Sequence, residues 1–226
     1  ALAPGAHVLV YFAYDPATSG EMDLFAIPAL RHLFDQRSNL TFYTLNPNGL
    51  ATVRRTARLA VAGRVAENEV DVALRRVIAR TIYLSGGAAV LPLVGITPQG
   101  AQKPSSSGRT TALPKPSLAV ILAPRTEDLQ HWLELVQPWD GTPVVAYTAA
   151  GVDPMARPYL DSSQLQGLVS GFDGAAAYTA LLDEPESTQS YLRLQAVAQN
   201  WGHFAMFFIL LTGNVIGFLQ RNREES

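Results

Sequence analysis

Cysteine is missing from this sequence, and lysine is nearly so. No cysteine occurs in 226 residues, and two of the 17 basic residues are lysines, Lys103 and Lys115. The missing thiol excludes disulfides, thiolate catalysis, cysteine-ligated metals and a lipidated amino-terminal cysteine. The formal net charge of −2 at pH 7 predicts no basic surface, so a nucleic-acid partner is not expected. The four histidines are dispersed along the chain, and no two have the spacing of a metal site.

Charge is also missing from one long segment near the carboxyl end. Between Arg193 and Arg221 there are 27 residues without Asp, Glu, Lys or Arg. The apolar part, about 200–219, supplies the roughly 20 residues that cross a bilayer core. It is apolar on nearly all sides, whereas a helix packed on a soluble domain shows a polar face. We therefore predict a stalk and one transmembrane helix within 186–220, followed by a short tail at 221–226.

The residues at the two ends of this span predict its orientation. Trp201 stands at one end, and Arg221 and Arg223 follow the other, as interfacial anchors do. Because basic residues favour the cytoplasmic side, we expect a cytoplasmic carboxyl terminus and an extracytoplasmic domain at 1–185. A tail-anchored cytoplasmic domain is the alternative.

Polar and small residues inside the span predict contact with other helices. Gly213 and Gly217 have the GxxxG spacing that lets two membrane helices approach closely. Asn214 is a polar side chain that needs a partner in hydrocarbon, and His203 lies near the same helical face. The expected partners are membrane lipid and other transmembrane helices, in a homo-oligomer or a hetero-oligomer.

Strand-like and helix-like runs alternate along residues 1–185. The expected strands are 7–14, 40–45, 81–84, 117–123, 143–148 and 165–171. The expected helices are 20–36, 50–80, 88–96, 126–136, a short piece around 155–160, and 173–183. This alternation predicts a doubly wound α/β domain, Rossmann-like or flavodoxin-like, with a mostly parallel sheet of five or six strands. The loop 97–117 leaves the sheet at the amino ends of the strands, which favours a flexible excursion or a docking segment over a lid.

Polar residues at the ends of the expected strands form a candidate ligand site. Ligands in this architecture bind at the carboxyl edge of the sheet. The residues that this edge would gather are Asp15, Ser19, Asn46, Ser85, Thr148 and Asp153. They would suit a small polar or cationic molecule.

The turn after the first strand, DPATSGEMD, has one glycine and three acids. A dinucleotide site needs GxGxxG there, and the acids would repel a pyrophosphate, so no cofactor is expected. Asp15, Glu21 and Asp23 could hold Mg²⁺. The alternative is structural: Thr18 and Glu21 have the spacing of a helix capping box.

Known catalytic patterns each fail at a required residue. Receiver domains need a lysine after the fifth strand, and no lysine follows the expected strand 143–148. Phosphatases of the haloacid dehalogenase type need an acid at the position of Ala17. The segment 167–171 has a serine between two glycines at the wrong spacing for a hydrolase nucleophile. Three hypotheses follow: a non-catalytic membrane-anchored interaction subunit, which we favour, a ligand-sensing domain, and a metal-dependent hydrolase or transferase.

Overall fold

The described part of the chain comprises the α/β domain and part of the carboxyl-terminal segment. In this computed structural model the described residues are 2–62, 70, 72, 74–75, 80–87, 115–136, 141–182, 194, 197–198 and 201–216. The expected helix 88–96, the loop 97–114 and most of the expected stalk lie outside these ranges.

A parallel sheet forms the centre of the domain. Its strands are β1 (His7–Phe12), β2 (Asn39–Thr44), β3 (Thr81–Tyr83), β4 (Leu118–Ala123), β5 (Val144–Thr148) and β6 (Gly167–Ser170). All the neighbouring pairs are parallel. In the described residues the sheet has six strands in the order β3-β2-β1-β4-β5-β6. The prediction of a doubly wound α/β fold is confirmed, and the order is the Rossmann one rather than the flavodoxin one.

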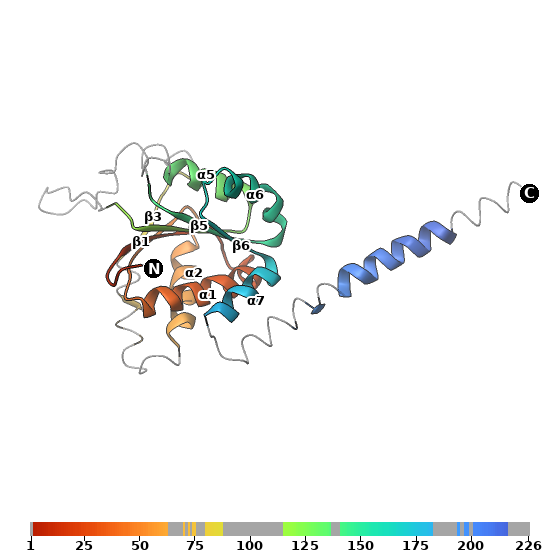
Figure 1. Cartoon of the computed structure of the whole chain (residues 1–226). Helices are drawn as coiled ribbons and strands as arrows, with labels where there is room; N and C mark the ends of the chain where they lie inside the picture. Colours follow the sequence, from red (N-terminus) through yellow and green to blue (C-terminus); the bar gives the residue numbers. More distant parts are fainter. Residues whose placement is uncertain are drawn as a thin grey trace, which may run out of the picture.

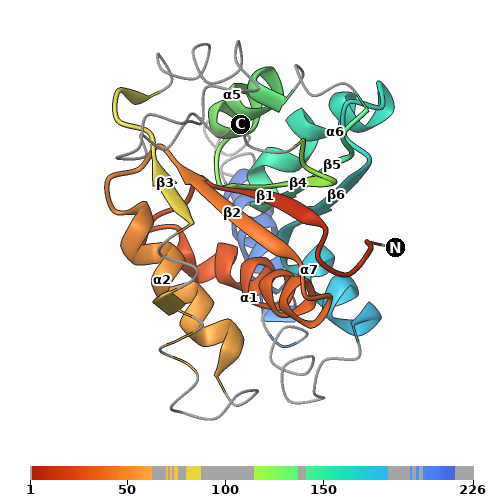
Figure 2. The same cartoon turned by 90° about the vertical axis from the view of Figure 1, so that its left-hand side faces the viewer.

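Helices cover both faces of this sheet (Figures 1 and 2). One face carries α1 (Ser19–Asp35), α2 (Gly49–Val61) and α7 (Gly171–Leu181); the other carries α5 (Thr126–Val136) and α6 (Asp153–Asp161). A 3₁₀ turn, η2 (Ala150–Val152), leads into α6. The strand order reverses direction between β1 and β4. Because each crossover is right-handed, the reversal moves α5 and α6, which connect β4, β5 and β6, to the opposite face.

The alternation of side chains along each strand builds two separate cores. Val8, Val10 and Phe12 point toward α1 and belong to the larger core. Leu9 and Tyr11, between them, point to the other face and pack in the core beneath α5 and α6. Since both faces are covered, the strands are apolar at nearly every position, as in β1 and β4.

The start of α1 differs from the predicted capping box. Thr18 is the N-cap residue, but its side chain makes no capping hydrogen bond within the described residues. Glu21 does not reach back to Thr18 either: its Oε1 accepts a hydrogen bond from Ala150 N at 2.8 Å. The capping-box prediction is therefore wrong. The acid instead ties α1 to η2, which follows β5.

Gly49 at the start of α2 is required by a close approach to β2. A Cβ at this position would lie 2.7 Å from both Cβ and Cγ2 of Thr44, a fully buried residue. We expect Gly49→Ala to lower the free energy of unfolding by about 1–3 kcal/mol through overpacking. Gly20→Ala is the matched control. No atom of the described residues lies within 4 Å of the position that its methyl group would take, so the change should stabilise α1 by about 0.5 kcal/mol. Urea unfolding of both variants measures the difference, and equal stability would contradict the close approach.

The carboxyl-terminal segment contains a helix at 201–216, which Figure 1 shows in blue beyond α7. Among the residues that the structure describes, no helix combines the length and the apolar character that crossing a membrane requires. The predicted span 200–219 extends beyond the described helix: residue 200 and residues 217–219 lie outside the described ranges.

Candidate functional site

The reversal of strand order places the carboxyl ends of β1 and β4 side by side. In open α/β sheets this switch point is where ligands bind, because the loops that follow the two strands diverge to opposite faces. The turn at 13–18 follows β1, and Arg125 follows β4. These two segments therefore form the first region to consider.

Asp15 organises the turn after β1. Its Oδ1 accepts hydrogen bonds from Ala17 N at 2.9 Å and from Thr18 N at 3.3 Å. Its Oδ2 accepts one from Asn46 Nδ2 at 3.3 Å. Asn46 follows β2, so two of the predicted edge residues do lie together. Both carboxylate oxygens are used in fixing the two turns.

Across the switch point, Arg125 forms a bidentate ion pair with Asp128. Its Nε donates to Oδ2 at 2.9 Å and its Nη2 donates to Oδ1 at 3.3 Å. These hydrogen bonds raise the pKa of Arg125, and attraction to Asp128 and Asp15 adds to the rise. The guanidinium charge of Arg125 is therefore held against the Asp128 carboxylate at the start of α5. This pair was not predicted from the sequence, although Arg and Asp three residues apart at a helix start are a recognisable signal.

The other predicted edge residues do not converge on one point. Ser19 donates to Pro16 O at 2.8 Å, within its own turn. Thr148 is buried and its hydroxyl lies 3.0 Å from Ser170 Oγ. Asp153 accepts from Arg157 Nε at 2.8 Å on α6. Ser85 is exposed after β3.

The three acids proposed for a metal site also separate. Asp15 holds its turn and Glu21 binds Ala150 N, whereas Asp23 lies between α1 and α2, where its Oδ1 accepts hydrogen bonds from Tyr14 Oη at 2.9 Å and from Thr56 Oγ1 on α2. In the described ranges, no three His, Asp or Glu side chains gather as metal ligands do.

Asp23 is the centre of a polar network between α1, α2 and the end of β1. Besides Tyr14, it accepts a hydrogen bond from Thr56 Oγ1 at 3.3 Å and pairs with Arg55. The Tyr14 hydroxyl also lies 3.0 Å from Thr56 Oγ1. Burial raises the pKa of Tyr14, and the charge on Asp23 raises it further. A buried network that is satisfied in this way fixes how the helices pack.

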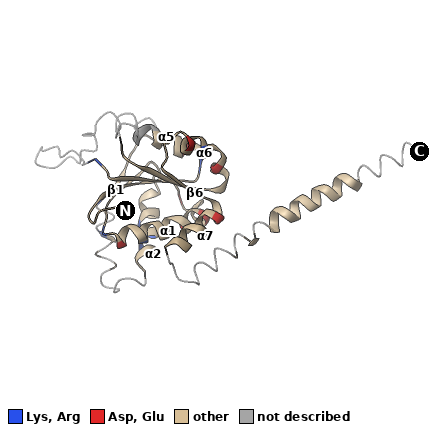
Figure 3. Cartoon of the chain, viewed as in Figure 1, with Lys and Arg blue, Asp and Glu red and all other residues tan. Residues whose placement is uncertain are grey.

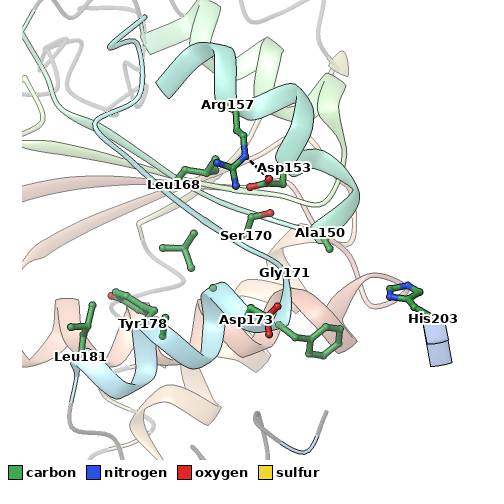
Figure 4. A pocket seen from close by; sticks show the side chains of 14 residues that line it. Ala150, Asp153, Arg157, Leu168, Ser170, Gly171, Asp173, Tyr178, Leu181 and His203 are labelled. Carbon is green, nitrogen blue, oxygen red and sulfur yellow. Dashed lines mark hydrogen bonds and ion pairs between the residues drawn. The ribbon is translucent and has the colours of Figure 1, made fainter. Parts of the chain in front are cut away.

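A second region is a groove of about 660 Å³ along β6, between α6 and α7 (Figure 4). Its polar lining comes from Asp153, Arg157, Ser170, Asp173 and Tyr178, and its apolar floor includes Leu168. His203, from helix 201–216, lies at one end. The groove could not be predicted from the sequence, because the strand order is needed to know that β6 ends the described sheet and leaves its side open between α6 and α7. Asp153 and His203 are the two lining residues that were predicted as site or contact residues.

Helix 201–216 presents an unusual surface. Every one of its residues is exposed, and Figure 3 shows no charged residue on it. Ten large apolar side chains are each 50–69% exposed: Trp201, Phe204, Met206, Phe207, Phe208, Ile209, Leu210, Leu211, Val215 and Ile216. Of the predicted helix-contact residues, His203, Gly213 and Asn214 lie on this helix, and Gly217 lies outside the described residues.

The fold thus defines a doubly wound α/β domain of Rossmann-like strand order. Neither a comparison with protein-family models nor a search of curated proteins finds a significant match to this chain. Function must therefore be argued from the groove, the switch point and the apolar helix.

Proposed function

We propose that this chain is a membrane-anchored, non-catalytic interaction domain that works as a subunit of a larger membrane protein assembly. The observation that carries the proposal is the all-round exposure of large apolar side chains on helix 201–216. Contiguous apolar surface of this kind marks a protein or membrane contact, because leaving it in water is unfavourable. At about 25 cal/mol per Å² of buried apolar area, ten large side chains supply a strong driving force toward lipid.

The length of the apolar segment supports a bilayer as the environment. The described 16 residues, 201–216, correspond to about 24 Å of helix. The sequence continues with Gly217, Phe218 and Leu219 before the first charge at Arg221. As a helix, 201–219 would extend about 28 Å, close to the ~30 Å of a hydrocarbon core.

The polar residues of the helix fit the same environment. The hydroxyl of Thr212 donates to Phe208 O at 2.8 Å, so it is satisfied within the helix, as hydrocarbon requires. A Cβ at Gly213 would meet no atom of the described residues within 4 Å, which leaves room for a second helix to approach. Asn214, exposed beside it, can hydrogen-bond across such a contact.

The acids of the α/β domain support an interaction role over catalysis. Asp15, Glu21 and Asp23 each accept hydrogen bonds that fix a turn, an interhelical link or a buried network. A carboxylate engaged in this way is used for structure, and the turn after β1 has no glycine-rich loop for a phosphate.

Leu210→Arg tests the membrane anchor, because residue 210 is the midpoint of 201–219. A charge there costs about 3 kcal/mol in the middle of a membrane helix, so partition of the chain into phosphatidylcholine vesicles should fall about 100-fold. The control is Leu59→Arg, which changes an exposed leucine of α2 (39% exposed) and should leave partition unchanged. Flotation of both variants measures it. Equal flotation of wild type and Leu210→Arg, or wild type that stays out of the vesicles, would remove the proposal.

A further inference from the structure

The geometry of the β6 edge points to a partner for this domain: we infer that a second copy of the chain docks on the groove, with the two β6 strands pairing antiparallel about a two-fold axis at Val169. The inference rests on the proposed interaction role and names the partner. It would extend the sheet continuously from one copy to the other.

β6 is an edge strand of the sheet that the described residues form, and its backbone has hydrogen-bonding groups that face the groove. Ala119 N donates to Pro143 O, so by alternation Ala146 faces β6. Its partner in the register is Leu168, and a residue in a parallel pair bonds with the two neighbours of its partner. The N–H and C=O of Leu168, and the N–H of Ser170, therefore point out into the groove. Edge groups of this kind are a template for another strand.

The charge pattern above the strand also fits a second copy. Arg157 lies over Leu168 and Asp153 lies over Ser170 (Figure 4), and the two side chains form an ion pair within α6. In an antiparallel pair centred on Val169, Leu168 of one copy faces Ser170 of the other. Arg157 then faces Asp153 of the second copy, and the reciprocal pair forms at the same time. This surface is therefore self-complementary in charge, as a two-fold interface requires.

The lower wall of the groove presents one face of α7. Gly174, Ala177, Tyr178 and Leu181 line it. Their spacing of i, i+3, i+4 and i+7 makes one helical face, and Leu181 is 84% exposed. Two copies of this face would meet beneath the paired strands. The small residues on the face let the two α7 helices come close enough for the strands to pair.

Complementary charge variants test the contact between copies. We expect the full-length chain in detergent to dimerise, and Arg157→Asp or Asp153→Arg alone to weaken the dimer about tenfold, because each places like charges across the axis. Mixing the two variants should restore affinity to near the wild-type value, as heterodimers recover both opposite-charge pairs. The repulsion inside each chain is the same before and after mixing, so recovery reports only the contact between chains.

Differently tagged chains and co-purification measure the proportion of heterodimers in the mixture. A statistical proportion, or a wild-type chain that stays monomeric, overturns the inference. If helix 201–216 alone held the dimer, the charges on α6 would not affect pairing. The mixture would then contain the statistical proportion of heterodimers, and the inference would be overturned. Flotation with vesicles is measured on the same variants: unchanged flotation with no dimer rejects the β6 contact and leaves the membrane anchor standing.

A second pair of variants tests α7 without altering the charges of α6. Ala177 lines the groove, whereas Ala180 is exposed on the same helix and is not part of the groove lining. Ala177→Arg should weaken the dimer about tenfold or more, and Ala180→Arg should leave it near the wild-type value. Neither alanine is buried, so both variants are expected to fold. Equal effects of the two substitutions would overturn the inference.

Discussion

Replacing Trp132 by alanine is expected to lower the free energy of unfolding by about 3–5 kcal/mol, the usual loss for a large buried aromatic. The Trp132 side chain is fully buried on α5. Its ring lies on Tyr11, with centroids 3.6 Å apart, and near Tyr43, with centroids 5.8 Å apart. The substitution would leave a cavity over Tyr11 of β1 and Tyr43 of β2. Urea unfolding followed by circular dichroism measures the loss.

Two matched variants sharpen this result. Trp132 Nε1 is buried and has no hydrogen-bond partner among the described residues, so Trp132→Phe removes an unsatisfied group while keeping a ring in place. Trp132→Phe should therefore lower the free energy of unfolding by much less than Trp132→Ala does. Trp201→Ala deletes a tryptophan that is 66% exposed and should leave the unfolding of the α/β domain unchanged. A cost for Trp132→Ala no larger than that for Trp201→Ala would contradict the packing described above.

The second large effect is expected at alkaline pH. Burial raises the pKa of four tyrosines above the usual value of 10.0: Tyr11, Tyr14, Tyr43 and Tyr147. In the unfolded chain these hydroxyls ionise near pH 10, while in the folded chain they stay protonated. Their contribution to stability is therefore complete below pH 10 and is lost as the pH rises above it. Above pH 10 each tyrosine lowers the free energy of unfolding by about 1.4 kcal/mol per pH unit, and the four together lower it by about 5 kcal/mol per pH unit.

Absorbance at the tyrosinate band, recorded with circular dichroism, measures this effect. The four tyrosines should ionise only in the cooperative step in which the secondary structure is lost. Tyr43→Phe is the sharpest variant, because the Tyr43 hydroxyl has no hydrogen-bond partner in the part of the chain that the structure describes. At pH 7 we expect the free energy of unfolding of this variant to be close to that of the wild type. Above pH 10 its free energy of unfolding should fall less steeply, by about 1.4 kcal/mol per pH unit. An unchanged slope would show that Tyr43 ionises in the folded protein.

The architecture could be predicted because each strand is an apolar run bounded by turn residues. The segment 117–123 became β4 (Leu118–Ala123), and 126–136 matched α5 to the residue. Strand order could not be predicted, since it depends on which helices pack together, such as α1 with α2 and α7. The capping box failed for a related reason: Glu21 accepts a hydrogen bond from Ala150 N, 129 residues away, in place of the local donor.

The candidate site was predictable only where neighbouring strands end together. Asp15 and Asn46 follow adjacent strands and do meet. Thr148 and Asp153 lie at the end of β5 and after it, on the other half of the sheet, and contact Ser170 and Arg157 instead. The groove itself required knowing that β6 is an edge strand, which no local pattern encodes.

The position of β1 in the middle of the sheet has a consequence for biosynthesis. Val8 pairs with Leu118, 110 residues later in the chain, so one side of β1 stays open until β4 has been made. At bacterial or eukaryotic ribosome speeds, that interval is on the order of 5 to 20 s. Contacts so distant in sequence also slow folding after release. The nascent amino-terminal half therefore exposes an apolar strand edge for seconds, the period in which a holding chaperone has most to protect.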